Sequence, residues 1–120
     1  MKIDELVPPL ELCKKIPAGE FEDSAFVFVP LSNGKEWQIK KRMMHMEAYH
    51  SKIYPAPTLQ EILEELHKHQ EDVFLKWSET AYHEWLVNAY THNKEDYQSH
   101  HKNIVVAAIK TWLEMKGIEA

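Results

Sequence analysis

The sequence of 120 residues has one cysteine, three glycines and no long apolar run. The single Cys13 excludes an internal disulfide, and so few glycines exclude a glycine-rich phosphate-binding loop. No stretch approaches the roughly 20 apolar residues that a bilayer span requires. The first residues carry Asp4 and Glu5 where a signal peptide needs an apolar core. We therefore expect a cytoplasmic protein that makes no membrane contact.

Basic charge is also scarce, because 14 Lys and Arg stand against 19 Asp and Glu, a formal net charge of −5. Dedicated nucleic-acid-binding domains are usually net basic. The chain also lacks a Gly-x-Ser-x-Gly nucleophile motif and a His-Glu-x-x-His zinc motif. We predict a protein that is not an enzyme and needs no cofactor. Its composition, 44% apolar and 28% charged, is typical of one globular domain over residues 1–120.

The N-terminal half contains signals for a short helix and a hairpin. Two prolines at 8–9 suit a first helical turn, and Pro17 ends the apolar helical spacing that follows them. Residues 26–29 are β-branched or aromatic and predict a strand whose two faces are both covered. Asn33-Gly34 is the strongest short-range hairpin signal and leads to a returning strand at 37–42.

The middle of the chain opens a helix and then a second hairpin. Thr58 is placed to cap the helix with Glu61 three residues later, and leucine and isoleucine follow at helical spacing. Alternating apolar residues at 73–77 and 85–89 predict two further strands. The first and second halves share a helix–hairpin order, so a duplication stays open as an alternative.

A long C-terminal helix is predicted over Lys94–Lys116, capped by Asn93 and stopped by Gly117. Together these elements predict an α+β fold. In it, the two hairpins form one four-stranded, mainly antiparallel sheet. The sheet is packed by the helices near Thr58–Lys68 and Lys94–Lys116, and a short N-terminal helix completes the domain.

One segment carries a family resemblance. Tyr-Pro-Ala-Pro-Thr-Leu at Tyr54–Leu59 opens a Leu-rich helix, two strands follow, and the last helix bears Ala107, Ala108, Trp112 and Leu113 before Gly117. Over residues 54–117 the chain resembles a family of small uncharacterised phage and prophage proteins of gut bacteria. The resemblance implies a phage or prophage origin, and it implies no activity and no site residue.

Eight histidines are the one unusual feature of the composition. A zinc site needs converging ligands, such as two histidines four residues apart on a helix, and no pair here has that spacing. His92 with His100 or His101 could meet at the entry to the last helix. Scattered surface histidines explain the count more simply, so we predict no metal site and keep these three as the candidate ligands of the alternative.

Met43, Met44 and Met46 form a cluster that suits an adaptable apolar contact surface, with Tyr49 close to it. Adjacent residues on a strand point to opposite faces, so a single core layer does not account for all three methionines. Phe26 and Phe28 offer a second apolar patch. We predict from these residues a protein–protein interface and a homo-oligomer, unless a helix covers each face.

Lys40, Lys41 and Arg42 lie beside Trp37, a combination that nucleic-acid-binding surfaces use. Strand alternation divides the charges between two faces, and this favours a buried tryptophan with solvated lysines. The sequence therefore predicts a non-catalytic accessory or protein-binding module. A metal-binding or nucleic-acid-associated protein is the alternative.

Overall fold

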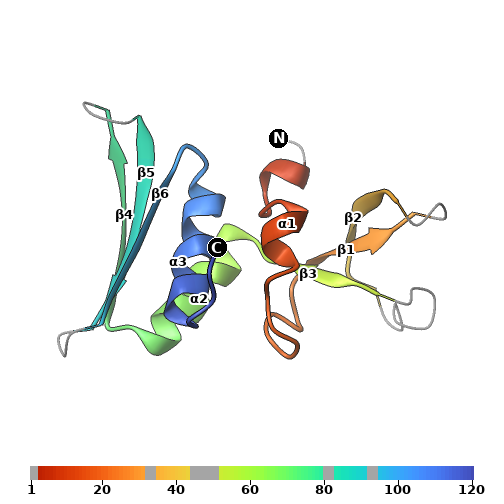
Figure 1. Ribbon diagram of the computed structural model, residues 1–120, viewed down its shortest axis with the longest axis horizontal. Helices are drawn as coiled ribbons and strands as arrows, with labels where there is room; N and C mark the ends of the chain where they lie inside the picture. The colour runs from red at the N-terminus through yellow and green to blue at the C-terminus, as the bar shows by residue number, and fades with distance from the viewer. Residues whose placement is uncertain (1–2, 32–34, 44–51, 80–82, 92–94) are drawn as a thin grey trace. The chain divides into compact units, whose positions relative to one another are not determined.

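The computed structural model describes residues 3–31, 35–43, 52–79, 83–91 and 95–120. The chain divides into two compact units, Met1–Thr58 and Leu59–Ala120, which are taken separately below. The described residues form an α+β structure in which each unit contains a three-stranded antiparallel sheet (Figure 1). No helix in this part of the chain combines the length and the apolar composition that a membrane span needs.

The first unit is built around the strand β1, which pairs with a strand on each side. Phe28 lies opposite Ile39 of β2 and opposite Tyr54 of β3. The short N-terminal helix and the first hairpin are therefore present as predicted. The elements of this unit are η1 (Ile3–Glu5), α1 (Leu10–Cys13), β1 (Phe26–Pro30), β2 (Trp37–Lys41) and β3 (Tyr54–Ala56).

Side chains on both faces of β1 are buried. Val27 and Val29 on one face are fully buried, and Phe28 on the other is 7% exposed. Leu12 and Cys13 of α1 are also buried, and α1 contacts β3. The prediction that both faces of this strand are covered is therefore confirmed. It explains the unbroken run of apolar residues in β1, because a strand covered on both faces has no polar side.

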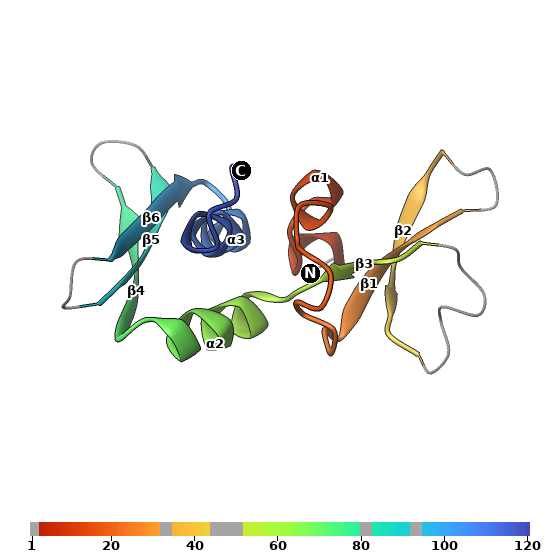
Figure 2. The ribbon, with the colours of Figure 1, turned by 60° about the horizontal axis from the view of Figure 1, so that its bottom comes forward.

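The second unit is a sheet in the strand order β4-β5-β6 with a helix before it and a helix after it. Two views show α3 lying along one face of this sheet (Figures 1 and 2). The helix α2 begins directly after Thr58, as predicted, and contacts both α3 and β4. The elements are α2 (Leu59–His69), β4 (Asp72–Ser78), β5 (Glu84–Tyr90), β6 (Asp96–His101) and α3 (Ile104–Met115).

The core of the second unit lies between α3 and the central strand β5. Val87 and Ala89 of β5 and Trp112 of α3 are fully buried. The hydroxyl of Thr111 lies 3.0 Å from the backbone carbonyl oxygens of Val87 and Ala107, so it links the helix to β5. Burial of these side chains removes apolar surface from water and supplies the main stabilisation of the unit.

The predicted single four-stranded sheet is wrong, because the two hairpins belong to different sheets. In each sheet one strand of the hairpin pairs with a third strand nearby. β3 pairs with β1, and β6 pairs with β5. Both inner strands then have two partners, and neither has a free edge for the other hairpin.

The predicted helix Lys94–Lys116 is also wrong over its first half. Residues 96–101 form β6, where half-buried and exposed residues alternate, and α3 begins only at Ile104. Asn103 caps α3 by accepting hydrogen bonds from the backbone N–H groups of Val105 and Val106, at 2.8 and 3.4 Å. The cap predicted at Asn93 lies outside the described residues. Residues 96–101 therefore follow the period-two alternation of a strand and not the helical spacing that predicted a helix there.

We expect Asn103→Ala to lower the free energy of unfolding by about 1 kcal/mol, because two N–H groups at the start of α3 lose their acceptor. Asn103→Asp is the matched control, since its carboxylate keeps the acceptor, and it should stay within a few tenths of a kcal/mol of the parent chain. Urea denaturation followed by circular dichroism measures both. Equal stability of Asn103→Ala and the parent chain would contradict the assigned cap.

Candidate functional site

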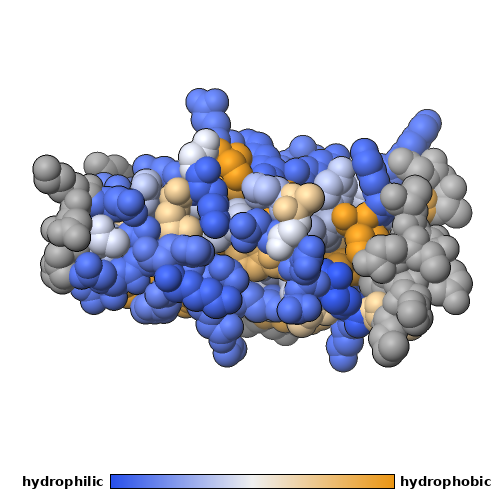
Figure 3. Space-filling model, turned by 90° about the horizontal axis from the view of Figure 1, so that it is seen from below, coloured by the Kyte–Doolittle hydropathy of each residue, from blue (hydrophilic) through white to orange (hydrophobic). Residues whose placement is uncertain are grey.

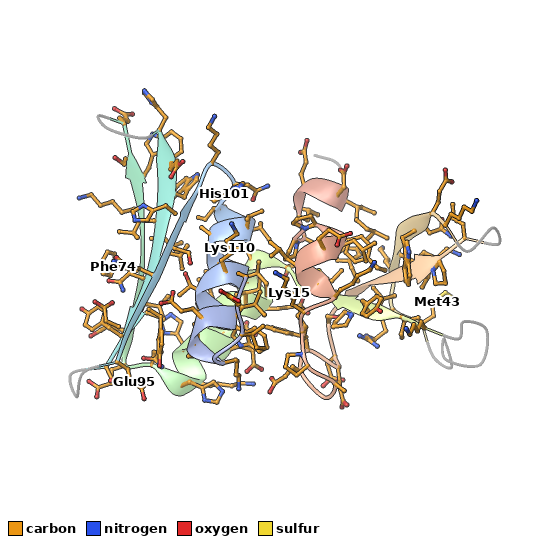
Figure 4. The ribbon with its side chains drawn as sticks, viewed as in Figure 1. Lys15, Met43, Phe74, Glu95, His101 and Lys110 are labelled. Atoms are coloured by element: carbon orange, nitrogen blue, oxygen red, sulfur yellow. The ribbon has the colours of Figure 1, made fainter. Side chains whose placement is uncertain are left out.

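The sheet of the second unit has one face covered by α3 and one open face. Cross-strand partners share a face, so Leu75 and Val87 lie on the helix side, and Phe74 and Asn88 lie on the open side. Figure 4 shows the Phe74 side chain on the side of the sheet away from α3. No described element of this unit covers that side.

Exposed large hydrophobic side chains are few in the described residues, and three of the five lie on β4. Phe74, Leu75 and Trp77 are 42%, 38% and 39% exposed; the other two are Ile3 and Met43. The face of the molecule drawn in Figure 3 is mainly hydrophilic, and its hydrophobic residues form small separate patches. Apolar exposure concentrated on one strand is therefore a local feature, and such a patch commonly marks an interaction site.

Aromatic contacts hold the exposed side chains of β4 in place. On the open face, the ring of Phe74 packs edge-on against Tyr90, with 6.2 Å between centroids. On the helix side, Trp77 packs against Trp85 at 5.4 Å. Rings fixed in this way lose little conformational entropy when a partner covers them, which favours their use in binding.

Polar contacts order the rest of the open face. The side-chain amide of Asn88 donates hydrogen bonds to the Asp96 carboxylate, at 2.6 Å, and to the backbone carbonyl of Tyr97, at 2.9 Å. These bonds join β5 to β6, and β6 is the edge strand opposite to β4. The open face therefore has a rigid polar half over β6 and an aromatic half over β4.

β4 occupies an edge of its sheet. In the strand order β4-β5-β6 it pairs only with β5, and the pairing is continuous from Asp72 opposite Tyr90 to Ser78 opposite Glu84. An edge strand presents backbone N–H and C=O groups that no strand of its sheet bonds. The exposed aromatic residues and the free edge thus belong to the same seven residues.

The predicted interface residues of the first unit have different surroundings. Phe28 is buried and Phe26 is half-buried in β1, whereas Met43 is 67% exposed directly after β2. Figure 4 marks the position of Met43. The other three predicted interface residues, Met44, Met46 and Tyr49, lie outside the described residues.

Sequence reasoning missed β4 as a surface. Val73, Leu75 and Trp77 were interpreted as the alternating apolar positions of a hairpin strand, and Phe74 was assigned no role. The run Val73-Phe74-Leu75 is apolar at three consecutive positions, so each face of the strand carries at least one apolar side chain. That signal was available, but it does not distinguish a strand covered on both faces from an edge strand exposed on both.

The histidines do not converge in the described residues. His100 and His101 are neighbours on β6 and therefore point to opposite faces, rather than diverging on a helix as predicted. His101 Nδ1 accepts a hydrogen bond of 2.9 Å from the backbone N–H of Asn103. Within the described ranges no three His, Cys, Asp or Glu side chains are grouped to hold a metal ion. His92, the third candidate ligand, lies outside them.

The basic residues of the first hairpin do not form one surface with Trp37. Lys40 points to the face opposite Trp37, and Arg42 donates hydrogen bonds to the backbone carbonyl and the hydroxyl of Ser24, at 2.8 and 3.0 Å. Trp37 itself packs against Tyr54 at 5.3 Å, with the Lys14 ammonium 5.7 Å from its ring. The Trp37 ring and the Arg42 guanidinium therefore both make contacts with other residues of the first unit.

The first unit also contains a cavity of about 630 Å³ between residues 16–23, Arg42 and residues 53–55. Glu20, Glu22 and Asp23 line it. Its described lining includes no histidine, cysteine or serine. Arg42 and Tyr54 also belong to this lining.

Comparison with protein-family models, with curated proteins and with solved structures gives no match for this chain. The resemblance of residues 54–117 to small phage proteins accordingly stays a prediction. The arguments for function below depend on the geometry of the second unit.

Burial also lowers the reactivity of the single thiol, Cys13. Cys13 is fully buried, its Sγ lies 3.5 Å from the backbone carbonyl of Pro8, and burial raises its pKa from 9.0 to about 12. Because the thiolate is the reactive form, the folded chain should react with a disulfide reagent only as it unfolds. Rapid labelling of the native chain at neutral pH would contradict this assignment.

The same raised pKa makes stability depend on alkaline pH. The neutral Cys13 thiol contributes fully to the free energy of unfolding below about pH 9. This contribution is lost as pH rises toward 12, because the thiol of the unfolded chain ionises at a lower pH than the buried thiol of the folded chain. From about pH 8 to about pH 10, the parent chain should lose about 1 kcal/mol more unfolding free energy than Cys13→Ala. Urea denaturation at both pH values measures the difference. Equal losses would contradict the expectation.

Proposed function

We propose that this chain is a small non-catalytic module that binds another protein chain through β4 of its second unit. The single observation that supports it is the gathering of Phe74, Leu75 and Trp77, each more than one-third exposed, on one strand at the edge of a sheet. Leaving three large apolar side chains in water is costly, and a partner that covers them recovers that free energy.

The composition of the strand fits protein recognition better than other classes of ligand. Aromatic residues are enriched in protein–protein interfaces, and their fixed rings act as anchors. A peptide or strand that pairs with an exposed edge gains main-chain hydrogen bonds as well as side-chain contacts. Nucleic-acid surfaces need basic charge, and β4 contains only one basic residue, Lys76, beside Asp72.

We also propose that the module is an accessory protein of phage or prophage origin that acts in the cytoplasm. The resemblance of residues 54–117 supports the origin. The cytoplasmic location is supported by a chain whose single cysteine is a buried thiol, since extracellular proteins of this size commonly rely on disulfides.

The proposal is tested by capturing the partner of a tagged chain from cells that express it and titrating the purified partner. Phe74→Glu, which puts a charge on the apolar patch, should weaken the binding about tenfold or more. Ile3→Glu is the matched control, because it changes an exposed large apolar residue in the first unit, and it should leave the affinity unchanged. Circular dichroism confirms that both variants fold.

The proposal fails if the folded chain binds no protein saturably, or if Phe74→Glu and Ile3→Glu affect the affinity equally. A second copy of the chain is one permitted partner, and any other protein is equally compatible with this test.

A further inference from the structure

The edge strand β4 is complementary to itself, and we infer that its partner is a second copy of the same chain. The two β4 strands would pair antiparallel across a two-fold axis at Phe74, joining two three-stranded sheets into one of six strands. This inference rests on the proposed function and adds to it the identity of the partner and the register of the contact.

β4 lacks three of the features that normally prevent an edge from pairing, although it carries two charged side chains, Asp72 and Lys76. It has seven residues, contains no proline, and is paired with β5 without a bulge. Natural edge strands are commonly short, bulged, interrupted by proline or protected by inward charges. The opposite edge, β6, is polar throughout its sequence Asp-Tyr-Gln-Ser-His-His apart from Tyr97. The apolar edge is therefore β4.

Charge complementarity selects one register. With Phe74 on the two-fold axis, Asp72 of each copy lies opposite Lys76 of the other, so the contact contains two opposite-charge pairs. All four charged side chains lie on the open face, where Asp72, Phe74 and Lys76 alternate with residues of the helix side. Opposite charges directly across an antiparallel pair are stabilising, and like charges there are destabilising.

Neighbouring registers lose this complementarity. An axis at Leu75 places Phe74 opposite Lys76 and Asp72 opposite Ser78, so neither charge meets its opposite. An axis at Lys76 places the two lysines opposite each other. An axis between two residues would oppose side chains from different faces, which antiparallel pairing does not allow.

The same register places apolar residues opposite apolar residues. Phe74 meets Phe74 of the second copy on the open face, and each ring already packs against its own Tyr90 at 6.2 Å. On the helix side, Val73 lies opposite Leu75 of the second copy. The contact therefore covers Phe74 and Leu75, and every contact away from the two-fold axis occurs twice.

The decisive experiment exchanges the charges between two copies. Full-length Asp72→Lys and Lys76→Asp each replace two attractive pairs by two repulsive ones, and each should dimerise roughly tenfold or more weakly than the parent chain. An equimolar mixture of the two variants should recover the parental affinity, because each introduced charge meets its opposite on the other copy. Sedimentation equilibrium over the micromolar range measures the dimer affinity of the parent chain, of each variant and of the mixture.

Gln98→Lys is the matched control, since it adds a lysine to the open face of the same sheet but on β6. It should not change the dimer affinity. A parent chain that stays monomeric throughout overturns the inference. So does a dimer that the single variants leave intact, or one that their mixture does not restore.

A covalent measurement tests the register without depending on affinity. In a Cys13→Ala background, Phe74→Cys puts two thiols across the axis at a Cα separation of roughly 4.5–5.5 Å, within the range of a disulfide. Lys76→Cys, on the same strand and face, puts them more than about 13 Å apart. Mild oxidation should link the first variant rapidly and the second slowly. Equal rates would overturn the register.

These outcomes are separable from those of the proposed function. A chain that binds a different protein through Phe74 but never pairs with itself retains the proposed function and loses this inference. A chain that binds no protein of either kind loses both.

Discussion

The packing of α3 on one face of the β4-β5-β6 sheet is the interaction on which the second unit depends. Trp112 and its buried neighbours cover β5 and β6, and the Thr111 hydroxyl lies 3.0 Å from the Val87 carbonyl. A single helix of 12 residues is narrower than a three-stranded sheet, so it cannot shield every strand equally. The strand left at the margin is β4, and its helix-side residues Leu75 and Trp77 are correspondingly exposed.

The predictable parts of the fold are those in which local chemistry and tertiary packing agree. Thr58 before a leucine stripe predicts α2, and Asn33-Gly34 between two β-rich runs predicts the first hairpin, because each signal acts within a few residues. The third strand of each sheet was not predictable in this way. Tyr54–Ala56 has three residues and a proline, and it becomes a strand only because β1 is beside it.

β6 shows how two periodicities can compete in one segment. Tyr97, His101 and Ile104 fit a helical stripe, while Tyr97, Ser99 and His101 fit the alternation of a strand. The structure follows the alternation, and Asn103 then supplies the cap that starts α3. A sequence alone does not decide such a case, since the choice depends on β5 offering hydrogen bonds to a neighbour.

The candidate surface was less predictable than the fold, because exposure is a property of strand order. Phe74, Leu75 and Trp77 have the composition of a core strand, and they would be buried if β4 were central. β4 is at the edge because β6 adds to the far side of β5 and no described strand pairs with the other side of β4. The methionine cluster, which the sequence favoured, is described only at Met43, which is 67% exposed.

An edge strand with apolar faces and balanced charges has a simple use, which is to join copies of its own chain. The most direct measurement is amide hydrogen exchange at β4 as the protein concentration rises. The account predicts that exchange slows over Asp72–Ser78 with concentration, because outward N–H groups gain acceptors, while exchange over Asp96–His101 does not change. Exchange at β4 that is independent of concentration, or protection that appears at β6 instead, would contradict it.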